Sequence, residues 1–211
     1  MALANYTDLL NSIDGKSAWL HRNDLAAIVP DWVTLCEVTI NKGDMLVMGV
    51  DGLRTSDMET TWDSTSTNPA TTTSGTATVA LPSDFLEFRA PLYITFQGFR
   101  RELRQRPPSP MSLSERAQIN SIPTTYWISG NNLHLDPIPN ATYNMTGDYY
   151  TEVPSLETNA TNWLMTAAPG VYLNGAIAHG LLWLGPEFIA SPRGNGFMQS
   201  FRMGLSQVQR A

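Results

Sequence analysis

The sequence Thr124-Thr-Tyr-Trp-Ile-Ser-Gly-Asn-Asn-Leu-His-Leu-Asp-Pro-Ile-Pro139 predicts a β-hairpin. Alternating hydrophobic residues in Tyr126–Ile128 and Leu133–Leu135 indicate two short strands. Gly130-Asn131-Asn132 lies between the strands and supplies residues that tolerate a positive φ, as a tight turn requires. Pro137 and Pro139 end the second strand because proline has no N–H to donate to a sheet.

Further strands are predicted on both sides of this hairpin. The run from Tyr143 to Tyr150 alternates again and leads the chain to Pro154. Upstream, Val79–Arg106 alternates in the same way, with a turn expected at Gly98. Residues 63–77 contain almost only Ser, Thr, Asn, Pro, Ala and Gly, so we expect a flexible loop that buries little.

Helices are predicted at both ends of the chain. Hydrophobic residues follow helical spacing near Tyr6 and again after Pro30, where Gly43 is the expected end and a continuation through Met45–Met48 the alternative. Residues 171–184 are apolar on almost every side and carry several small residues, which predicts a central helix approached closely by another helix. The fold class expected is α+β, with residues 1–60 and 155–211 forming a helical domain and residues 61–154 an inserted antiparallel β-rich domain with the loop at 63–77.

Two bulk properties restrict the function. The net charge of −6 argues against a general nucleic-acid binder, and the charged fraction of 15% is low for a soluble domain. Eleven of the thirteen basic residues are arginine, a residue suited to planar contacts at interfaces. No stretch of about eighteen apolar residues occurs, so we expect no membrane partner.

Catalytic and metal-binding patterns are not found. His21, His134 and His179 have no metal-ligand spacing, and Cys36 has no second cysteine. Asp84 and Glu87 are more simply explained by a turn after a proline than as paired acids. The sequence therefore predicts no catalytic residue, no metal and no cofactor, and the protein is expected not to be an enzyme.

The most distinctive local feature is a cluster of arginines in a predicted strand: Arg100, Arg101, Arg104 and Arg106. A protein interface, a solvated strand face and phosphate binding remain three alternatives for it. The suitability of arginine for planar contacts at interfaces favours the protein interface.

The C-terminal tail is predicted to be an amphipathic helix after a linker at 191–196. Its apolar stripe consists of Phe197, Phe201, Leu205 and Val208. Such a stripe must pack on the protein's own core or on a neighbour, and we expect it to dock on a neighbouring copy or partner protein.

Several motifs taken in order resemble the head-to-tail adaptor proteins of tailed bacteriophages, the group related to podovirus tail tubular proteins and gatekeepers. They are the segments Tyr6-Thr-Asp-Leu-Leu10, Pro30-Asp-Trp-Val-Thr-Leu-Cys-Glu37, Leu81-Pro-Ser-Asp-Phe-Leu-Glu87, Pro123-Thr-Thr-Tyr-Trp-Ile128 and Tyr149-Tyr-Thr-Glu-Val-Pro154. Residues 63–77 are the part least similar to the family.

The resemblance implies a structural virion protein at the head–tail junction. It implies a homo-oligomeric ring, usually of twelve copies, between the portal protein and a tail or nozzle protein. The ring would extend the DNA ejection channel, with genomic DNA passing through the lumen without specific binding.

From the aromatic residues alone, an alternative is a carbohydrate-binding tail or decoration module that stacks sugars on Tyr126, Trp127, Tyr143, Tyr149 and Tyr150.

Overall fold

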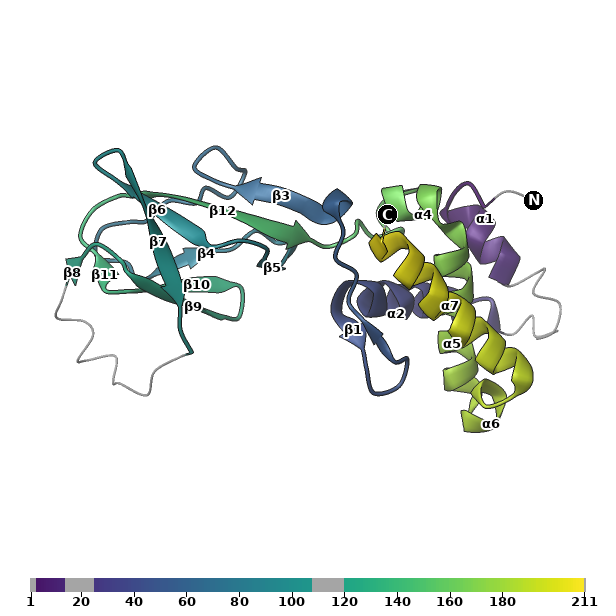
Figure 1. The fold of residues 1–211 in the computed structure, drawn as a ribbon. Helices are drawn as coiled ribbons and strands as arrows, with labels where there is room; N and C mark the ends of the chain where they lie inside the picture. The colour runs from purple at the N-terminus through teal and green to yellow at the C-terminus, as the bar shows by residue number, and fades with distance from the viewer. Residues whose placement is uncertain (1–2, 14–24, 108–119, 211) are drawn as a thin grey trace. The chain divides into compact units, whose positions relative to one another are not determined.

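The computed structural model describes residues 3–13, 25–107 and 120–210. Contacts divide the chain into two compact units, which are treated separately below. The helical unit contains Met1–Met58 and Val153–Ala211, and the β unit contains Glu59–Glu152. Figure 1 shows helices near both ends of the chain and a curled mixed sheet formed by its middle, which confirms the α+β class.

The described helical unit consists of short helices and longer ones around a shared core. Its elements are α1 (Tyr6–Asn11), α2 (Val29–Lys42), β1 (Gly43–Asp44), β2 (Val50–Asp51), the 3-10 helix η3 (Ser56–Met58), α4 (Trp163–Ala167), α5 (Pro169–Leu184), α6 (Pro186–Ile189) and α7 (Pro192–Arg210).

Capping side chains explain where α1 and α4 begin. The side-chain oxygen of Asn5 accepts from the Asp8 N–H at 3.0 Å, and that of Asn162 accepts from the Met165 N–H at 2.7 Å. Pro30 lies in the first turn of α2, where its missing N–H costs nothing, so this helix begins slightly before the position that the sequence predicts.

The central helix α5 is packed by α2 and α7, as its small residues predict. A Cβ atom on Gly175 would meet the Cys36 sulfur of α2 and the Phe201 ring of α7. A Cβ atom on Gly180 would lie 2.7 Å from the Trp32 ring. Close helix contact therefore offsets the low helix propensity of these glycines.

Of two helix boundaries predicted from sequence, one is wrong and one is confirmed. Residues 192–196, predicted as part of a linker, form the first turns of α7, because proline is tolerated at an early helical position. Gly43 ends α2 as expected: its φ of +78° turns the chain into the β1–β2 hairpin, which excludes the alternative continuation through Met45–Met48.

The β unit is dominated by one sheet of eight strands in the described part of the chain, with the order β3-β12-β6-β7-β9-β10-β4 and β5 attached to β12. The strands are β3 (Glu59–Trp62), β4 (Thr78–Ala80), β5 (Phe85–Phe88), β6 (Leu92–Phe96), β7 (Phe99–Gln105), β9 (Thr125–Ser129), β10 (Asn132–Asp136) and β12 (Asn144–Thr151). A short second pair joins β8 (Asn120–Ser121) to β11 (Ile138–Pro139).

The predicted hairpin is confirmed as β9–β10. Asn132 pairs with Ser129, so Gly130 and Asn131 form a two-residue loop, and Gly130 has a φ of +59°. A positive φ at the first loop position is what a type II′ turn requires. Leu133 and Leu135 point into the core of the sheet, as the alternation predicts.

Strand β12 pairs with three other strands of the sheet. It pairs with β3 on one side and with β6 and β5 in succession on the other. Its buried residues alternate, and they include Met145, Gly147 and Tyr149. A Cβ on Gly147 would lie 2.8 Å from a methyl carbon of Leu92, so glycine allows this close approach.

The expectation of a purely antiparallel sheet needs correction. Strands β7 and β9 run parallel, pairing Arg104 with Thr125 and Gln105 with Tyr126. Parallel neighbours require a long crossover, and the chain from residue 106 to residue 124 supplies one. Alternating hydrophobicity identifies a strand and its buried face, but it carries no information about direction.

Residues 63–77 are anchored to the sheet, which corrects the expectation that they bury little. Ala70 and Thr72 are buried, and Asn144 forms a β-bridge with Thr71. The Asn68 side-chain amide donates to the carbonyl oxygens of residues 80 and 81. Flexibility of this segment, and independent folding of the domains expected at 1–60 with 155–211 and at 61–154, stay predictions.

Candidate protein–protein interface

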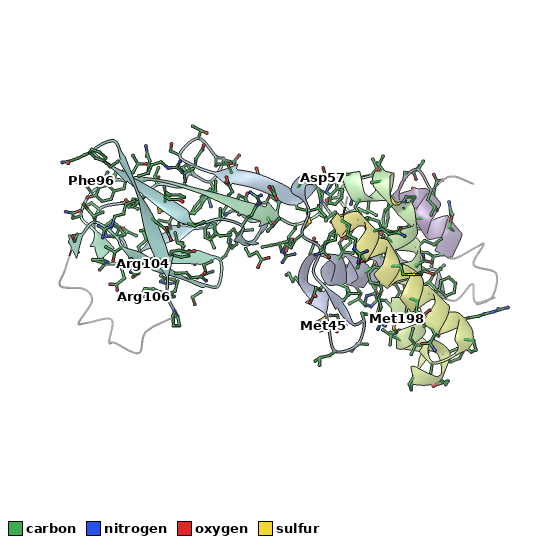
Figure 2. All side chains as sticks on the ribbon, in the orientation of Figure 1. Met45, Asp57, Phe96, Arg104, Arg106 and Met198 are labelled. Atoms are coloured by element: carbon green, nitrogen blue, oxygen red, sulfur yellow. The ribbon has the colours of Figure 1, made fainter. Side chains whose placement is uncertain are left out.

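The β7 arginine cluster, defined as Arg100, Arg101, Arg104 and Arg106, is exposed to solvent. In the described part of the chain, none of these guanidinium groups makes an ion pair with a carboxylate. The Arg100 guanidinium lies over the Tyr93 ring, 4.6 Å from its centroid, which holds it at the strand surface. Figure 2 marks Arg104 and Arg106 at the C-terminal end of β7.

Three of these arginines border a hollow of about 460 Å³, together with Glu102, Thr124 and Thr125. Strand β7 pairs with β6 along most of its length but with β9 only at Arg104 and Gln105. One side of Phe99–Leu103 therefore has no strand partner within the described chain. The Phe99 side chain on this open edge is 77% exposed, a feature that sequence reasoning missed.

The structure separates the four residues of the predicted tail interface into two buried and two half-buried side chains. Phe201 is fully buried and Leu205 nearly so, and both pack within the helical unit. These two residues are covered by the protein's own core in the single chain, and a part for them in an interface stays a prediction. Phe197 and Val208 are half-buried at the surface of α7 and stay candidates for an interface.

A groove of about 620 Å³ follows α7 beside η3, α4 and the start of α5. Val208 and the 58% exposed Met203 contribute apolar surface from α7, while Trp163 and Val171 contribute it from α4 and α5. Asp57 adds a carboxylate at η3. The groove has the mixed apolar and polar lining of a surface that binds a protein segment.

The β1–β2 hairpin presents a second apolar surface at Met45-Leu46-Val47. Leu46 is 98% exposed, and its two neighbours are more than half exposed. The Arg202 guanidinium of α7 donates to the Met48 carbonyl at 2.6 Å and fixes the base of this hairpin. The signal in the sequence is the apolar run that ends at Gly49, which the helical alternative would have placed in α2.

A third surface is the hydroxyl hollow, defined by Thr60, Thr61, Ser66, Ser83, Asp84 and Tyr149. It measures about 510 Å³. The Tyr149 hydroxyl donates to the exposed Asp84 carboxylate at 3.2 Å. Burial, with a contribution from that carboxylate, raises the pKa of Tyr149 to about 12, so the hydroxyl stays protonated.

A buried polar network connects α2 to the chain after the sheet. The Glu37 carboxylate accepts from the Leu156 N–H and the Ser155 hydroxyl, each at 2.7 Å. Burial raises the pKa of Glu37, although these hydrogen bonds partly offset the effect. Asn162 donates to the Pro154 carbonyl and to the Tyr172 hydroxyl, each at 2.7 Å. These contacts are structural, and nothing in sequence spacing indicated them.

The remaining titratable residues considered as catalytic or metal-binding candidates take part in hydrogen bonding and packing. The His179 ring nitrogen Nε2 is 3.0 Å from the Thr39 hydroxyl, and burial lowers the pKa of His179. The His134 ring stacks on Trp127 with 5.1 Å between ring centroids. Cys36 is buried, and burial raises the pKa of its thiol. No group of three metal-ligating side chains occurs among the described residues.

The proposed sugar-stacking aromatics are largely unavailable. Tyr126, Tyr143 and Tyr149 belong to the buried core of the β unit. Trp127 is half-buried against His134. A carbohydrate platform needs exposed ring faces, so the structure explains these residues better as packing.

Some residues named from sequence lie outside the described residues. His21 is one of them. Across the described helices, none is long and apolar enough to cross a membrane.

Comparison with known proteins identifies one family. Residues 4–211 match the family model of the SU10 adaptor protein, which is nearly the whole chain. No curated protein matches the sequence. The chain belongs to the SU10 adaptor protein family, a family of structural bacteriophage adaptor proteins and not of enzymes.

Proposed function

From its membership of the SU10 adaptor family, we propose that this protein is the structural adaptor at the head–tail junction of a phage virion, of the podovirus tail tubular or gatekeeper type. The observation that carries the proposal is the family match over residues 4–211. The accessible interface surfaces on both units support it, because an adaptor must bind several partners at once.

The proposed assembly is a closed ring of about twelve copies between the portal and the tail or nozzle protein. Identical copies form a ring when the same two different surfaces meet at every junction and the rotation closes. Each copy must then present four surfaces, two to its neighbours and one each to portal and tail. Such a protein is expected to expose much Arg and apolar surface in the absence of its partners.

The net charge supports the proposed passage of genomic DNA through the ring. The net charge of −6 per copy repels phosphate, and this lets a duplex slide without specific binding. A lumen lined by many free arginines would instead hold the duplex through phosphate contacts.

Cryo-electron microscopy of the intact virion tests the proposal. We expect density matching the curled sheet and the α2–α5–α7 packing at the head–tail junction, and the symmetry of that density gives the copy number. Particles in which this chain is missing from the junction contradict the proposed function.

The α7 groove is our candidate for the portal contact, because Val208 and Met203 keep it partly apolar. Deleting residues 191–211 is an unsuitable test, since it removes Phe201 from the core. Met203→Asp is better because the side chain is exposed. We expect it to reduce attachment of the purified protein to DNA-filled heads at least about 10-fold.

A matched control is Gln199→Asp, an exposed position on the same helix that does not border the groove. Attachment equal to that of the natural protein is expected for this control. Equal attachment of the Met203→Asp protein would remove the groove from the portal contact while leaving the adaptor role intact.

A further inference from the structure

The β7 arginine cluster is an accessible set of positive charges that lacks a carboxylate partner within the described chain. Arg101, Arg104 and Arg106 border one hollow, and no carboxylate in the described residues pairs with them. Like charges that border one hollow repel each other, and a negatively charged partner relieves that repulsion. The strand is therefore suited to bind an acidic or phosphate-bearing surface.

The surroundings of the cluster favour a protein over a nucleic acid. Glu102 lies within the cluster and repels phosphate. Phe99 exposes most of its ring on the open edge of the same strand. Arginine next to an exposed aromatic residue is typical of protein interfaces, where both are enriched.

The hydroxyl hollow provides the complementary chemistry on the same unit. A guanidinium group has five N–H donors and needs a carboxylate and further oxygen acceptors around it. Asp84 supplies an exposed carboxylate, and Thr60, Thr61 and Ser83 supply hydroxyl oxygens beside it. A second carboxylate, that of Asp148, accepts from Thr61 at 2.7 Å close by.

The two surfaces occupy different parts of the sheet. Strand β7 carries the arginines, while β3, the segment before β5 and β12 border the hollow, and β6 and β12 separate β7 from β3 in the strand order. One copy can therefore use both surfaces at once, each toward a different neighbour. This is the arrangement that a head-to-tail contact in a ring requires.

We propose that the β7 arginine cluster of one copy docks on the hydroxyl hollow of a second copy, with Arg104 paired to Asp84. The inference rests on the proposed ring and names the surfaces that join its copies. It assigns the occupant of the hollow as an arginine side chain of this same protein.

Charge exchange in the purified full-length protein tests the pairing. Sedimentation velocity over a range of concentrations gives the association constant. Arg104→Glu and Asp84→Lys are each expected to lower it at least about 30-fold, because each places like charges together. An equimolar mixture of the two variants is expected to associate as strongly as the natural protein. In the mixture, the carboxylate introduced at position 104 meets the ammonium group introduced at position 84 at one junction, and the natural pair forms at the other.

Two controls separate charge pairing from misfolding and from general electrostatics. Asp84→Asn keeps an acceptor for Tyr149 and removes the charge, so it should weaken association without altering the circular dichroism spectrum. Arg193→Glu and Glu157→Lys change equally exposed charges on the helical unit and should leave association unchanged.

Three outcomes would overturn the inference: a natural protein that stays monomeric at every concentration, single variants that associate normally, or a mixture no better than either variant. Loss of duplex DNA binding in Arg104→Glu, with association unaffected by Asp84→Lys, would instead assign the cluster to nucleic acid. Density in the virion tests the proposed function separately. If the protein lies at the junction but Arg104 is unpaired there, only this inference is rejected.

Discussion

Adding a single methyl group at Gly175 should destabilise the helical unit, although alanine forms helices better than glycine. The added Cβ of Gly175→Ala would lie 2.7 and 2.9 Å from two ring carbons of Phe201 and still closer to the Cys36 sulfur. Ordinary carbon contacts are about 3.5–4.0 Å, so α2 and α7 must both move away from α5. Both neighbours are fully buried and cannot swing into solvent.

The magnitude follows from two opposing effects. Overpacking a tightly packed core costs about 1–3 kcal/mol, and the two rigid neighbours place this site at the upper end. Alanine recovers about 1 kcal/mol through helix propensity. We therefore expect a net loss of about 2 kcal/mol, which lowers the melting temperature by about 4–8 °C in a protein of this size.

Gly196→Ala is the matched control, because its Cβ meets no atom within 4 Å and the residue lies in α7. This variant should gain about 0.5–1 kcal/mol. Circular dichroism at the helical band during urea unfolding measures both variants, since the described α-helices belong to the helical unit. Equal or greater stability of Gly175→Ala would refute the packing argument, as would the same change in both variants.

Three further predictions concern the buried polar groups, each measured by the free energy of unfolding. Burial raises the pKa of Glu37 in the folded protein, so the carboxyl of the unfolded chain ionises at a lower pH. The natural protein therefore loses stability as pH rises from 4.5 through the raised pKa. Glu37→Gln should lack this loss. Burial lowers the pKa of His179 in the folded protein, so the unfolded chain binds a proton more readily. Stability is therefore lost as pH falls from 6.5 toward the lowered pKa. His179→Gln should be less sensitive to acid. A pH profile shared by variant and natural protein would contradict either assignment. Asn162→Ala removes a helix cap, one buried hydrogen bond and one partly buried hydrogen bond, and it should cost about 2–4 kcal/mol. Loss of the simple cap at Asn5 should cost about 1 kcal/mol, and equal costs would show that the network adds nothing.

Local patterns predicted the elements of the fold well. The alternation around Gly130 identified the β9–β10 hairpin, and the small residues of 171–184 identified a central helix. Both patterns depend on side-chain period and backbone freedom, which are properties of neighbouring residues. Proline was less informative at helix ends, because the same residue can begin a helix or follow it.

The candidate interface was predicted only in part. The four arginines are exposed, as an interface requires, and Phe197 and Val208 stay accessible. The structure moves Phe201 and Leu205 into the core and adds Phe99 and the Met45–Val47 tip to the surface. An apolar stripe shows that a helix must pack, but its spacing does not distinguish an internal partner from an external one.

The sequence alone was enough to predict the α+β class and the adaptor family. Both predictions used periodicity, turn residues and ordered motifs, which depend on residues close together along the chain. Strand direction, the parallel β7–β9 pair and the meeting of Asp84 with Thr60 and Tyr149 depended on the tertiary structure. These features join segments far apart in sequence. Their geometry follows from how the whole sheet curls and packs, a balance that no local pattern records.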